Sequence, residues 1–441
     1  MARLVVSNAQ GEIFELPEFE MVGMNLDRCL RPAPSELIPL PYGSDLFQLP
    51  DRIALGYHPA SDKVVPVKEY QGERVFPVAA FMAPAHLQFL RAAYRTPAGA
   101  PRLSLYAYTA VGWEDGEFVV PATRIDADIR QDPAHVNLRL VDNEARRLLR
   151  RYPNNRLAAH LIENCVFRYG CPAARNFTLG RFELPLPASP GCNAACVGCI
   201  SEQPRESQVT PPQERITFTP TPEEIAEIAV PHLETAPAAV VSFGQGCEGE
   251  PLLVADVLAE AIALIRKRTC RGVINLNTNG SDPAAVERLC QAGLDSIRVS
   301  MNSAQEACYH AYYRPRHYSF QDVVESLRVV RRYGRWASIN YFVFPGLTDH
   351  PEEMAALARL VETTGLNMVQ TRNLNIDPDW YMEVLNLRSM PGEPTGIPAW
   401  LRWLRQSYPQ VRLGYFNPPR EVIQQSLAPP ANSAKAAGSS R

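Results

Sequence analysis

Residues 191–199 read Gly191-Cys192-Asn193-Ala194-Ala195-Cys196-Val197-Gly198-Cys199, three cysteines spaced C-x3-C-x2-C directly after a short strand-like segment. Three thiolates this close in sequence are typical of an iron–sulfur site. A [4Fe–4S] cube normally takes one protein thiolate per iron, so a group of three leaves one iron open to an outside ligand. The motif therefore predicts that Cys192, Cys196 and Cys199 hold a cluster at which chemistry takes place.

Two other uses of these cysteines fit the sequence less well. A structural zinc site usually has four ligands in two separated pairs, and no second C-x2-C-like pair is present. Disulfides are not favoured either, because ten cysteines scattered over 441 residues, with no secretory signal, are typical of a reduced, intracellular chain.

The three-cysteine motif resembles the signature of the radical S-adenosylmethionine (radical SAM) superfamily. The resemblance implies that S-adenosylmethionine chelates the open iron and is cleaved to a 5′-deoxyadenosyl radical, which abstracts a hydrogen atom from a substrate. It also implies a reductant such as a ferredoxin or flavodoxin. The substrate cannot be read from the sequence. At Gly198 the chain departs from the family, which usually carries an aromatic residue there, so we expect adenine to pack differently.

From residue 181 onward, short β-like runs alternate with longer amphipathic runs, which predicts βα units and a parallel sheet. Six strands are expected, at Phe182–Leu186, Val240–Phe243, Val273–Leu276, Ser296–Ser300, Ala337–Phe342 and Met368–Thr371. The fold class is thus α/β, a partial (βα)6 parallel barrel of the type that the resemblance implies. A complete eight-unit barrel is the alternative.

The first 180 residues have a different pattern, typical of a β-rich N-terminal domain. Asp115-Gly116 predicts a hairpin between Arg102–Val111 and Glu117–Val120, and Gly11 predicts another between Arg3–Val6 and Ile13–Leu16. A helical connector is expected near Asn143–Cys165. The predicted division is an N-terminal domain with its connector at 1–180, a radical SAM core at 181–375, a C-terminal extension at 376–426 and a disordered tail at 427–441.

Several polar residues follow the predicted strands, where ligands of parallel sheets gather. Gly249-Glu250-Pro251 matches the last three residues of the family's Gly-Gly-Glu-Pro element, although Glu248 replaces its first glycine. Asn277-Thr278-Asn279-Gly280 is similar to the family's Thr-Asn-Gly tripeptide. The cofactor contacts that the resemblance implies are Gly249, Glu250, Asn279, Ser300, Asn302, Asn340 and Gln370. On the last predicted strand, Gln370, Arg372 and Asn373 could face either the cofactor or the substrate. No catalytic residue is predicted.

Three of the other cysteines leave two interpretations open. Cys165 and Cys171 precede the first predicted strand of the core, and Cys247 lies in the glycine-rich loop. They could bind an auxiliary metal or serve a redox role, or they could be small buried hydrophobic residues. The polar and aromatic stretch from Tyr309 to His317 is interpreted as surface packing of a loop rather than as a grip on substrate.

The composition of the chain argues against nucleic acid and membranes as binding partners. The net charge of −3 and pI near 6.3 give no electrostatic footprint for nucleic acid. No apolar run reaches the roughly 18 residues that span a bilayer, and the start lacks the pattern of a signal peptide. We expect a cytoplasmic enzyme without membrane association. Two alternatives remain, an iron–sulfur electron-transfer protein and a non-catalytic S-adenosylmethionine-binding protein.

Overall fold

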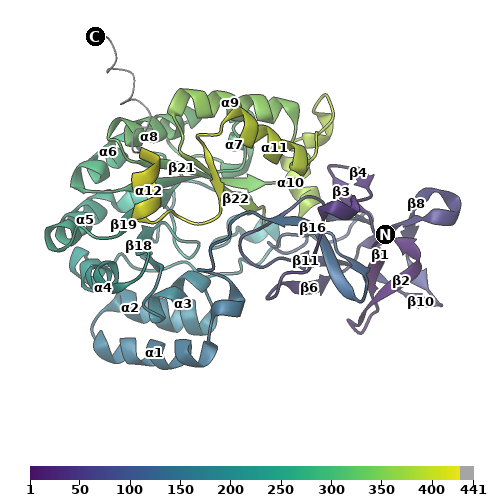
Figure 1. The fold of residues 1–441 in the computed structure, drawn as a ribbon, viewed down its shortest axis with the longest axis horizontal. Coiled ribbons are helices and arrows are strands. Elements are labelled where there is room, and N and C mark those ends of the chain that lie inside the picture. The colour runs from purple at the N-terminus through teal and green to yellow at the C-terminus, as the bar shows by residue number, and fades with distance from the viewer. Residues whose placement is uncertain (428–441) are drawn as a thin grey trace, which may run out of the picture.

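A seven-stranded parallel sheet lies at the centre of the larger part of the molecule (Figure 1). The computed structural model describes residues 1–427. The strands follow one another in chain order, each paired with the next. They are β17 (Glu183–Pro185), β18 (Val240–Phe243), β19 (Val273–Thr278), β20 (Ser296–Met301), β21 (Trp336–Val343), β22 (Met368–Asn373) and β23 (Arg412–Gly414).

The six predicted strands are confirmed, and the predicted number is one too small. The seventh, β23, lies in the segment that we expected to be a C-terminal extension. It has three residues with a single apolar side chain, Leu413, so no hydrophobic pattern marks it. The first and last strands do not pair, and the sheet is a partial barrel. Asn417 spans the open side, because its amide donates to Glu183 on β17 at 2.9 Å and to Ser242 on β18 at 3.0 Å.

Side chains alternate along these strands. One face is apolar and joins the main hydrophobic core, including Val241, Ile274, Ile297, Ile339 and Val369. The other face is apolar at the amino ends of the strands, where Val240, Val273, Trp336 and Met368 form a cluster with Ile423. Farther along the strands most of its side chains are polar and bond from strand to strand. Asn275 bonds to Ser242 and Ser296, and Gln370 bonds to Arg298 and Ser338. Because every second residue of a strand points to the same face, the barrel interior is mostly polar toward the carboxyl ends of the strands.

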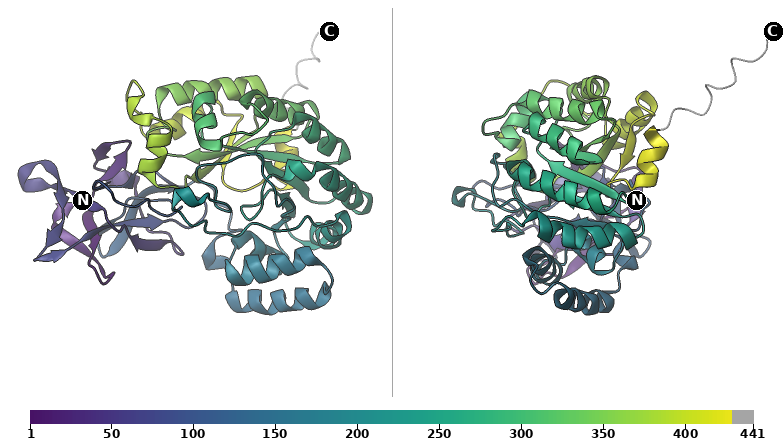
Figure 2. Two further views of the ribbon diagram at one scale, coloured as in Figure 1. Left: turned by 180° about the vertical axis from the view of Figure 1, so that it is seen from behind. Right: turned by 90° about the vertical axis from the view of Figure 1, so that its left-hand side faces the viewer.

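Helices cover the outside of the sheet, except the last one, which lies against the amino ends of the strands through Ile423 (Figures 1 and 2). They are α4 (Pro222–Thr235), α5 (Ala255–Arg268), α6 (Pro283–Ala292), α7 (Glu306–Tyr313), α8 (Phe320–Arg332), α9 (Pro351–Thr364), α10 (Pro378–Val384), α11 (Ile397–Ser407) and α12 (Arg420–Leu427). Local signals set several ends. Thr221 and Glu224 form a capping box at the start of α4, and Gly293 and Gly365 end α6 and α9 in the left-handed conformation.

Residues 1–126 form the predicted β-rich region at one end of the molecule (Figure 1). Its longer strands are β1 (Arg3–Ser7), β2 (Ile13–Glu20), β6 (Asp45–Gln48), β7 (Ile53–His58), β8 (Lys63–Val67), β11 (Phe76–Phe81) and β16 (Glu117–Arg124). Strands of two or three residues are β3 (Gly23–Asn25), β4 (Arg28–Leu30), β5 (Leu37–Pro39), β9 (Glu69–Tyr70), β10 (Glu73–Arg74), β12 (His86–Gln88), β13 (Arg91–Ala92), β14 (Tyr94–Arg95) and β15 (Gly112–Glu114). All strand pairs in this region are antiparallel, and most belong to one eleven-stranded sheet.

Both predicted hairpins are present, with one correction. β1 pairs with β2 around Gly11, and β15 pairs with β16 around Asp115-Gly116. The first arm of the second hairpin is Gly112–Glu114, so the expectation of a strand over Arg102–Val111 was wrong. Backbone groups of that stretch bond elsewhere, since Leu103 donates to Asp377 at 2.7 Å and Thr109 exchanges bonds with Ala80.

The helical connector is confirmed, but it is interrupted. It comprises α1 (Leu138–Arg151), α2 (Arg156–His160), a π-helical turn at Leu161–Arg168 and α3 (Pro172–Thr178). Asn155 caps α2 by accepting a bond from Ala158, which separates α2 from α1.

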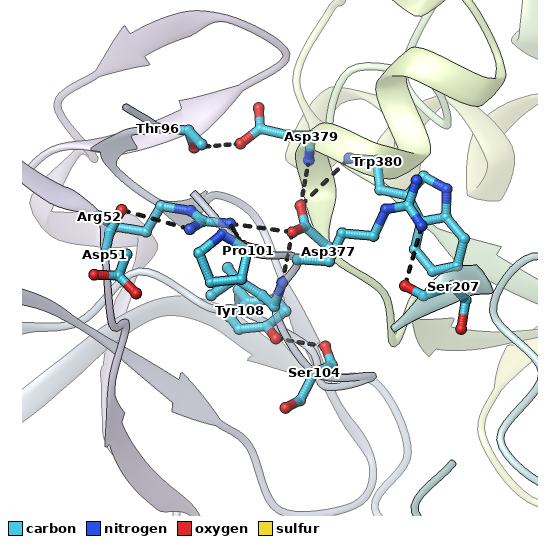
Figure 3. A network of polar contacts seen from close by, with 12 residues as sticks. Asp51, Arg52, Thr96, Pro101, Ser104, Tyr108, Ser207, Asp377, Asp379 and Trp380 are labelled. Atoms are coloured by element: carbon cyan, nitrogen blue, oxygen red, sulfur yellow. Dashed lines mark hydrogen bonds and ion pairs between the residues drawn. The ribbon is translucent and has the colours of Figure 1, made fainter. Parts of the chain in front are cut away.

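The β-rich region docks against the barrel through buried polar contacts (Figure 3). Arg52 forms an ion pair with Asp377 at 3.2 Å, and the two side chains are 1% and 2% exposed. Asp377 also caps α10. Nearer the barrel mouth, the amide of Asn373 at the end of β22 donates to His86 and accepts from Gln88, both on β12.

No helix within residues 1–427 has both the length and the apolar character needed to cross a bilayer. The tail predicted at 427–441 falls outside the described residues, apart from Leu427 at the end of α12.

Candidate functional site

A cavity of about 410 Å³ opens at the carboxyl ends of the barrel strands. Cys192, Cys196 and Cys199 all line it, although each is only partly buried. The opposite wall comes from the β-rich region and includes Phe81 and His86. The volume is within the range of small-molecule sites. The structure therefore brings the three cysteines together under a wall that the N-terminal region supplies.

The last turn of α7 holds in place the loop that carries the three cysteines (residues 191–199), which we call the cysteine loop. Backbone N–H groups of Ala195 and Val197 donate to the carbonyls of Tyr313 and Tyr312, at 3.0 and 2.9 Å. Beyond the helix, Arg316 donates to the carbonyl of Asn193 at 2.8 Å. Because the loop backbone is satisfied by these bonds, the cysteine side chains are free to face the cavity.

The donor set fits a cluster with one open iron. No other cysteine within residues 1–427 lines this cavity. Burial raises the pKa of Cys192 to about 11, with a further contribution from the Glu250 charge, and burial and the two neighbouring thiolates raise that of Cys196. A bound metal would reverse this by favouring the thiolates. The guanidinium of Arg215 donates to the sulfur of Cys199 at 3.7 Å.

The predicted glycine-rich loop packs directly against the cysteine loop. The N–H of Gly249 donates to the carbonyl of Ser189, and that of Glu250 to the carbonyl of Gly191, each at 2.7 Å. A Cβ atom on Gly249 would lie 1.8 Å from the carbonyl oxygen of Gly191. Glycine is therefore required there by the approach of two protein backbones.

Two buried carboxylates fasten this junction. Glu248, at the position of the family's first glycine, accepts bonds from the backbone N–H groups of Ala188 and Ser189. Glu250 accepts from Thr278 and from the N–H of Asn279, whose side chain in turn donates to Asn193 at 2.7 Å. Burial raises the pKa of both carboxyl groups to about 7. The Glu248 side chain thus ties the cysteine loop to the loop after β18.

The cavity receives five of the seven side chains expected to contact the cofactor. Gly249, Glu250, Asn279, Ser300 and Asn340 line it. The side-chain oxygen of Asn340 is buried and has no partner within the described structure, so it is available to a ligand.

The structure places the other two outside the lining. The amide of Asn302 donates to Tyr381 and to the carbonyl of Cys308. Gln370 lies deeper in the barrel, in bonds with Arg298 and Asn417.

The cavity also has two basic residues, Arg298 on β20 and Arg372 on β22. Arg372 was expected to face S-adenosylmethionine or the substrate, whereas sequence reasoning did not single out Arg298. Neither forms an ion pair with an acidic side chain of the described chain. Burial and the neighbouring guanidinium lower the pKa of Arg298 to about 10, and burial lowers that of Arg372. The sequence contains a signal that places both arginines. Arg298 lies two residues before Ser300 and Arg372 two residues after Gln370, so each shares a strand face with a residue that we expected to contact the cofactor.

The side chain of Tyr312 lies beside Gly198. A Cβ atom on Gly198 would lie 2.7 Å from the hydroxyl oxygen of Tyr312. Tyr312 and Tyr313 are both buried and line the cavity. The first five residues of the stretch that we interpreted as loop packing are the end of α7, and two of its tyrosines belong to the candidate site.

Residues 186–358 match the family model described as Radical SAM superfamily, and the chain therefore contains a radical SAM domain. Members of this superfamily are enzymes that use a [4Fe–4S] cluster and S-adenosylmethionine. The matched segment begins just before the cysteine loop and includes strands β18 to β21. A search of curated proteins finds no match.

Among solved structures, the chain is similar to a radical SAM methyltransferase from Sphaerobacter thermophilus, at 16% identity over 48% of this chain and 65% of that one, with a TM-score of 0.33. It is similar to Streptococcus suis SuiB at 12% identity over 55% of this chain and 53% of that one, with a TM-score of 0.36. The FeFe-hydrogenase maturase HydG from Carboxydothermus hydrogenoformans shares 14% identity over 66% and 72%, with a TM-score of 0.36. The chain thus spans less than two thirds of the first two.

Proposed function

We propose that this chain is a radical SAM enzyme that abstracts a hydrogen atom from a small substrate bearing an anionic group. The cluster and S-adenosylmethionine, when bound, supply the 5′-deoxyadenosyl radical. The observation that carries the proposal is the meeting of Cys192, Cys196 and Cys199 at one cavity, in which no other cysteine of residues 1–427 takes part. A reductant such as a ferredoxin or flavodoxin and a cytoplasmic location belong to the same proposal.

Within this proposal, the three thiolates hold the cluster and the junction around Gly249 and Glu250 positions S-adenosylmethionine beside it. Asn279, Ser300 and Asn340 face the same space and offer polar groups to the cofactor. Tyr312, whose hydroxyl lies next to Gly198, would provide an aromatic side chain beside the cysteine loop. The β-rich region covers the mouth of the barrel. A reactive radical must be kept away from water, and this cover helps to exclude it.

Arg298 and Arg372 support an anionic substrate. Both guanidinium groups reach the cavity and neither forms an ion pair with a carboxylate of residues 1–427, although Glu183 lies near both. The Nε atom of Arg298 is buried with no hydrogen-bond partner, whereas Arg372 donates to the carbonyls of Thr371 and Tyr415. A buried positive charge is costly unless it is paired. Arginine binds carboxylates and phosphates through two parallel bonds, and either group would complete this site.

Anaerobic reconstitution tests the reaction. The full chain should take up iron to about four per chain and release 5′-deoxyadenosine when S-adenosylmethionine and dithionite are added. The variant Cys192→Ala/Cys196→Ala/Cys199→Ala should do neither, whereas Cys290→Ser, which alters a buried cysteine on α6, should behave as the wild type. Absence of 5′-deoxyadenosine from a cluster-loaded wild-type protein would refute the proposed activity.

The substrate class is tested separately with simple probes. Small carboxylates and phosphates should raise the melting temperature of the reconstituted protein, and the rise should disappear in Arg298→Met/Arg372→Met. Cleavage of S-adenosylmethionine without substrate should survive in that variant. If anions stabilise the variant as well as the wild type, the two arginines do not bind the substrate.

A further inference from the structure

A second group of metal-ligating side chains lies outside the cavity lining. It consists of His160 at the end of α2, Cys165 in the π-helical turn and Cys247 in the loop after β18. Their ligand atoms all lie within 4.8 Å of one another, and no other set of three His, Cys, Asp or Glu ligand atoms among residues 1–427 lies this close together. The residues come from positions up to 87 apart in sequence, so folding alone assembles them.

The sulfur atoms have the separation that a single tetrahedral metal requires. Cys165 and Cys247 are free thiols whose sulfurs are 3.9 Å apart. Two thiolates bound to one tetrahedral zinc ion at about 2.3 Å lie about 3.8 Å from each other. Ligand atoms this close converge on one ion, whereas a cube binds each thiolate at a different iron.

The histidine provides an independent observation. The Nε2 atom of His160 is buried and has no hydrogen-bond partner among the described residues. A buried imidazole nitrogen without a partner costs free energy, and such atoms are uncommon in native structures. Cys165 and Cys247 are 3% and 7% exposed, so water has little access from their side. A metal ion would satisfy the nitrogen and use both thiolates.

We propose that His160, Cys165 and Cys247 bind one structural Zn²⁺ ion. Zinc prefers sulfur and nitrogen ligands in a tetrahedral arrangement, and two thiolates with one imidazole provide three of its four positions. A water molecule would take the fourth. Cys171 is not part of the group, although its N–H donates to the carbonyl of Cys165 at 2.8 Å.

The ion would join two parts of the molecule that hold the candidate site. Cys165 belongs to the helical connector, and Cys247 lies two residues before Gly249, which contacts the cysteine loop. The carbonyl of Cys247 also accepts a bond from Ile216 at 2.8 Å. Zinc at this position fixes the loop after β18 against the connector. The ion does not depend on the proposed radical reaction, because Cys247 does not line the cavity.

Metal analysis tests the site apart from the cluster. The variant Cys192→Ala/Cys196→Ala/Cys199→Ala removes the cluster ligands, and the full chain purified from zinc-supplemented medium should retain about one zinc per chain. Adding Cys165→Ser and Cys247→Ser should lower the zinc content at least tenfold, whereas adding Cys290→Ser should leave it unchanged. Wild-type protein with its cluster should contain the same zinc in addition to iron.

Cobalt provides a readout that does not depend on the folding of the serine variants. Co²⁺ added to the zinc-depleted triple variant should give a thiolate-to-cobalt charge-transfer band and the visible bands of a tetrahedral site, and one equivalent of Zn²⁺ should abolish both. His160→Gln should weaken cobalt binding at least tenfold. A zinc-free triple variant that shows no cobalt spectrum would overturn the proposal, whatever the outcome for the cluster.

Discussion

Gly249 shows how one residue can set the geometry of the whole site. Its N–H donates to Ser189, and its missing side chain lets the carbonyl of Gly191 approach. The approach joins the loop after β18 to the loop that carries the cysteines. Glu248 and Glu250 on either side add buried bonds to the same junction, so the cysteine loop has little freedom to move.

Gly249→Ala should therefore disrupt the cluster site. The added methyl group would lie 1.8 Å from the carbonyl oxygen of Gly191, so the two loops must separate. We expect a loss of about 1–3 kcal/mol in stability and at least tenfold weaker binding of S-adenosylmethionine, measured by thermal unfolding and isothermal titration. Gly191→Ala is the matched control, because its Cβ would only reach Leu253 at an ordinary 3.5 Å. Equal behaviour of the two variants would contradict this view of the junction.

At the scale of elements, local sequence signals and tertiary contacts cooperate at α4. Thr221 and Glu224 cap the helix, and Glu224 also binds Arg156 at the start of α2 with a shortest contact of 2.7 Å. The cap was predictable from four residues. The ion pair was not, because its partners lie 68 positions apart and belong to separate structural elements.

Glu224→Gln should lower stability in a pH-dependent way. The bond from Arg156 lowers the pKa of Glu224 to about 2 in the folded chain, against an ordinary value of 4.5. The carboxylate therefore stabilises the fold above about pH 4.5, and its contribution is lost as the pH falls toward 2. We expect a difference of about 1 kcal/mol at pH 7 that narrows by pH 3, measured by urea unfolding of the cluster-free chain. Glu223→Gln, at an exposed neighbouring position, should show little difference at either pH. A difference for Glu224→Gln that is independent of pH would contradict a contribution from the charge of the carboxylate.

The contrast between local signals and long-range contacts also explains how much of the fold and of the site could be predicted from the sequence. Apolar runs marked six strands of the sheet, and β23 was missed because it has only Leu413 to mark it. The three cysteines were identified from their spacing, which a cluster dictates. Arg372 was named from its place at the end of a predicted strand, but Arg298 was not, because only the folded barrel shows that it reaches the cavity. His160 joins Cys165 and Cys247 only through tertiary structure.

At the scale of the whole molecule, the β-rich region is a part of the candidate site. Phe81 and His86 line the cavity, and β12 bonds to Asn373 at the end of β22. No motif in the sequence predicted that the β-rich region lines the cavity, because this depends on how two regions far apart in sequence dock against each other. The docking is held by buried pairs such as Arg52 and Asp377 and by exposed ones such as Arg28 and Glu393 (Figure 3 shows the former).

Arg52→Leu should loosen this docking and expose the barrel mouth. Asp377 would remain buried without its cation, which typically costs about 3–5 kcal/mol, although it would keep the N–H donors of Leu103 and α10. We expect faster limited proteolysis between the two regions and faster loss of a reconstituted cluster in air. Arg28→Ala is the control, because its contact with Glu393 at 2.7 Å joins side chains that are 49% and 78% exposed, and such pairs contribute about 0–1 kcal/mol. If Arg52→Leu unfolds the chain in one step without earlier cleavage between the regions, the β-rich wall and the barrel form a single cooperative unit, and Arg52 stabilises the entire fold.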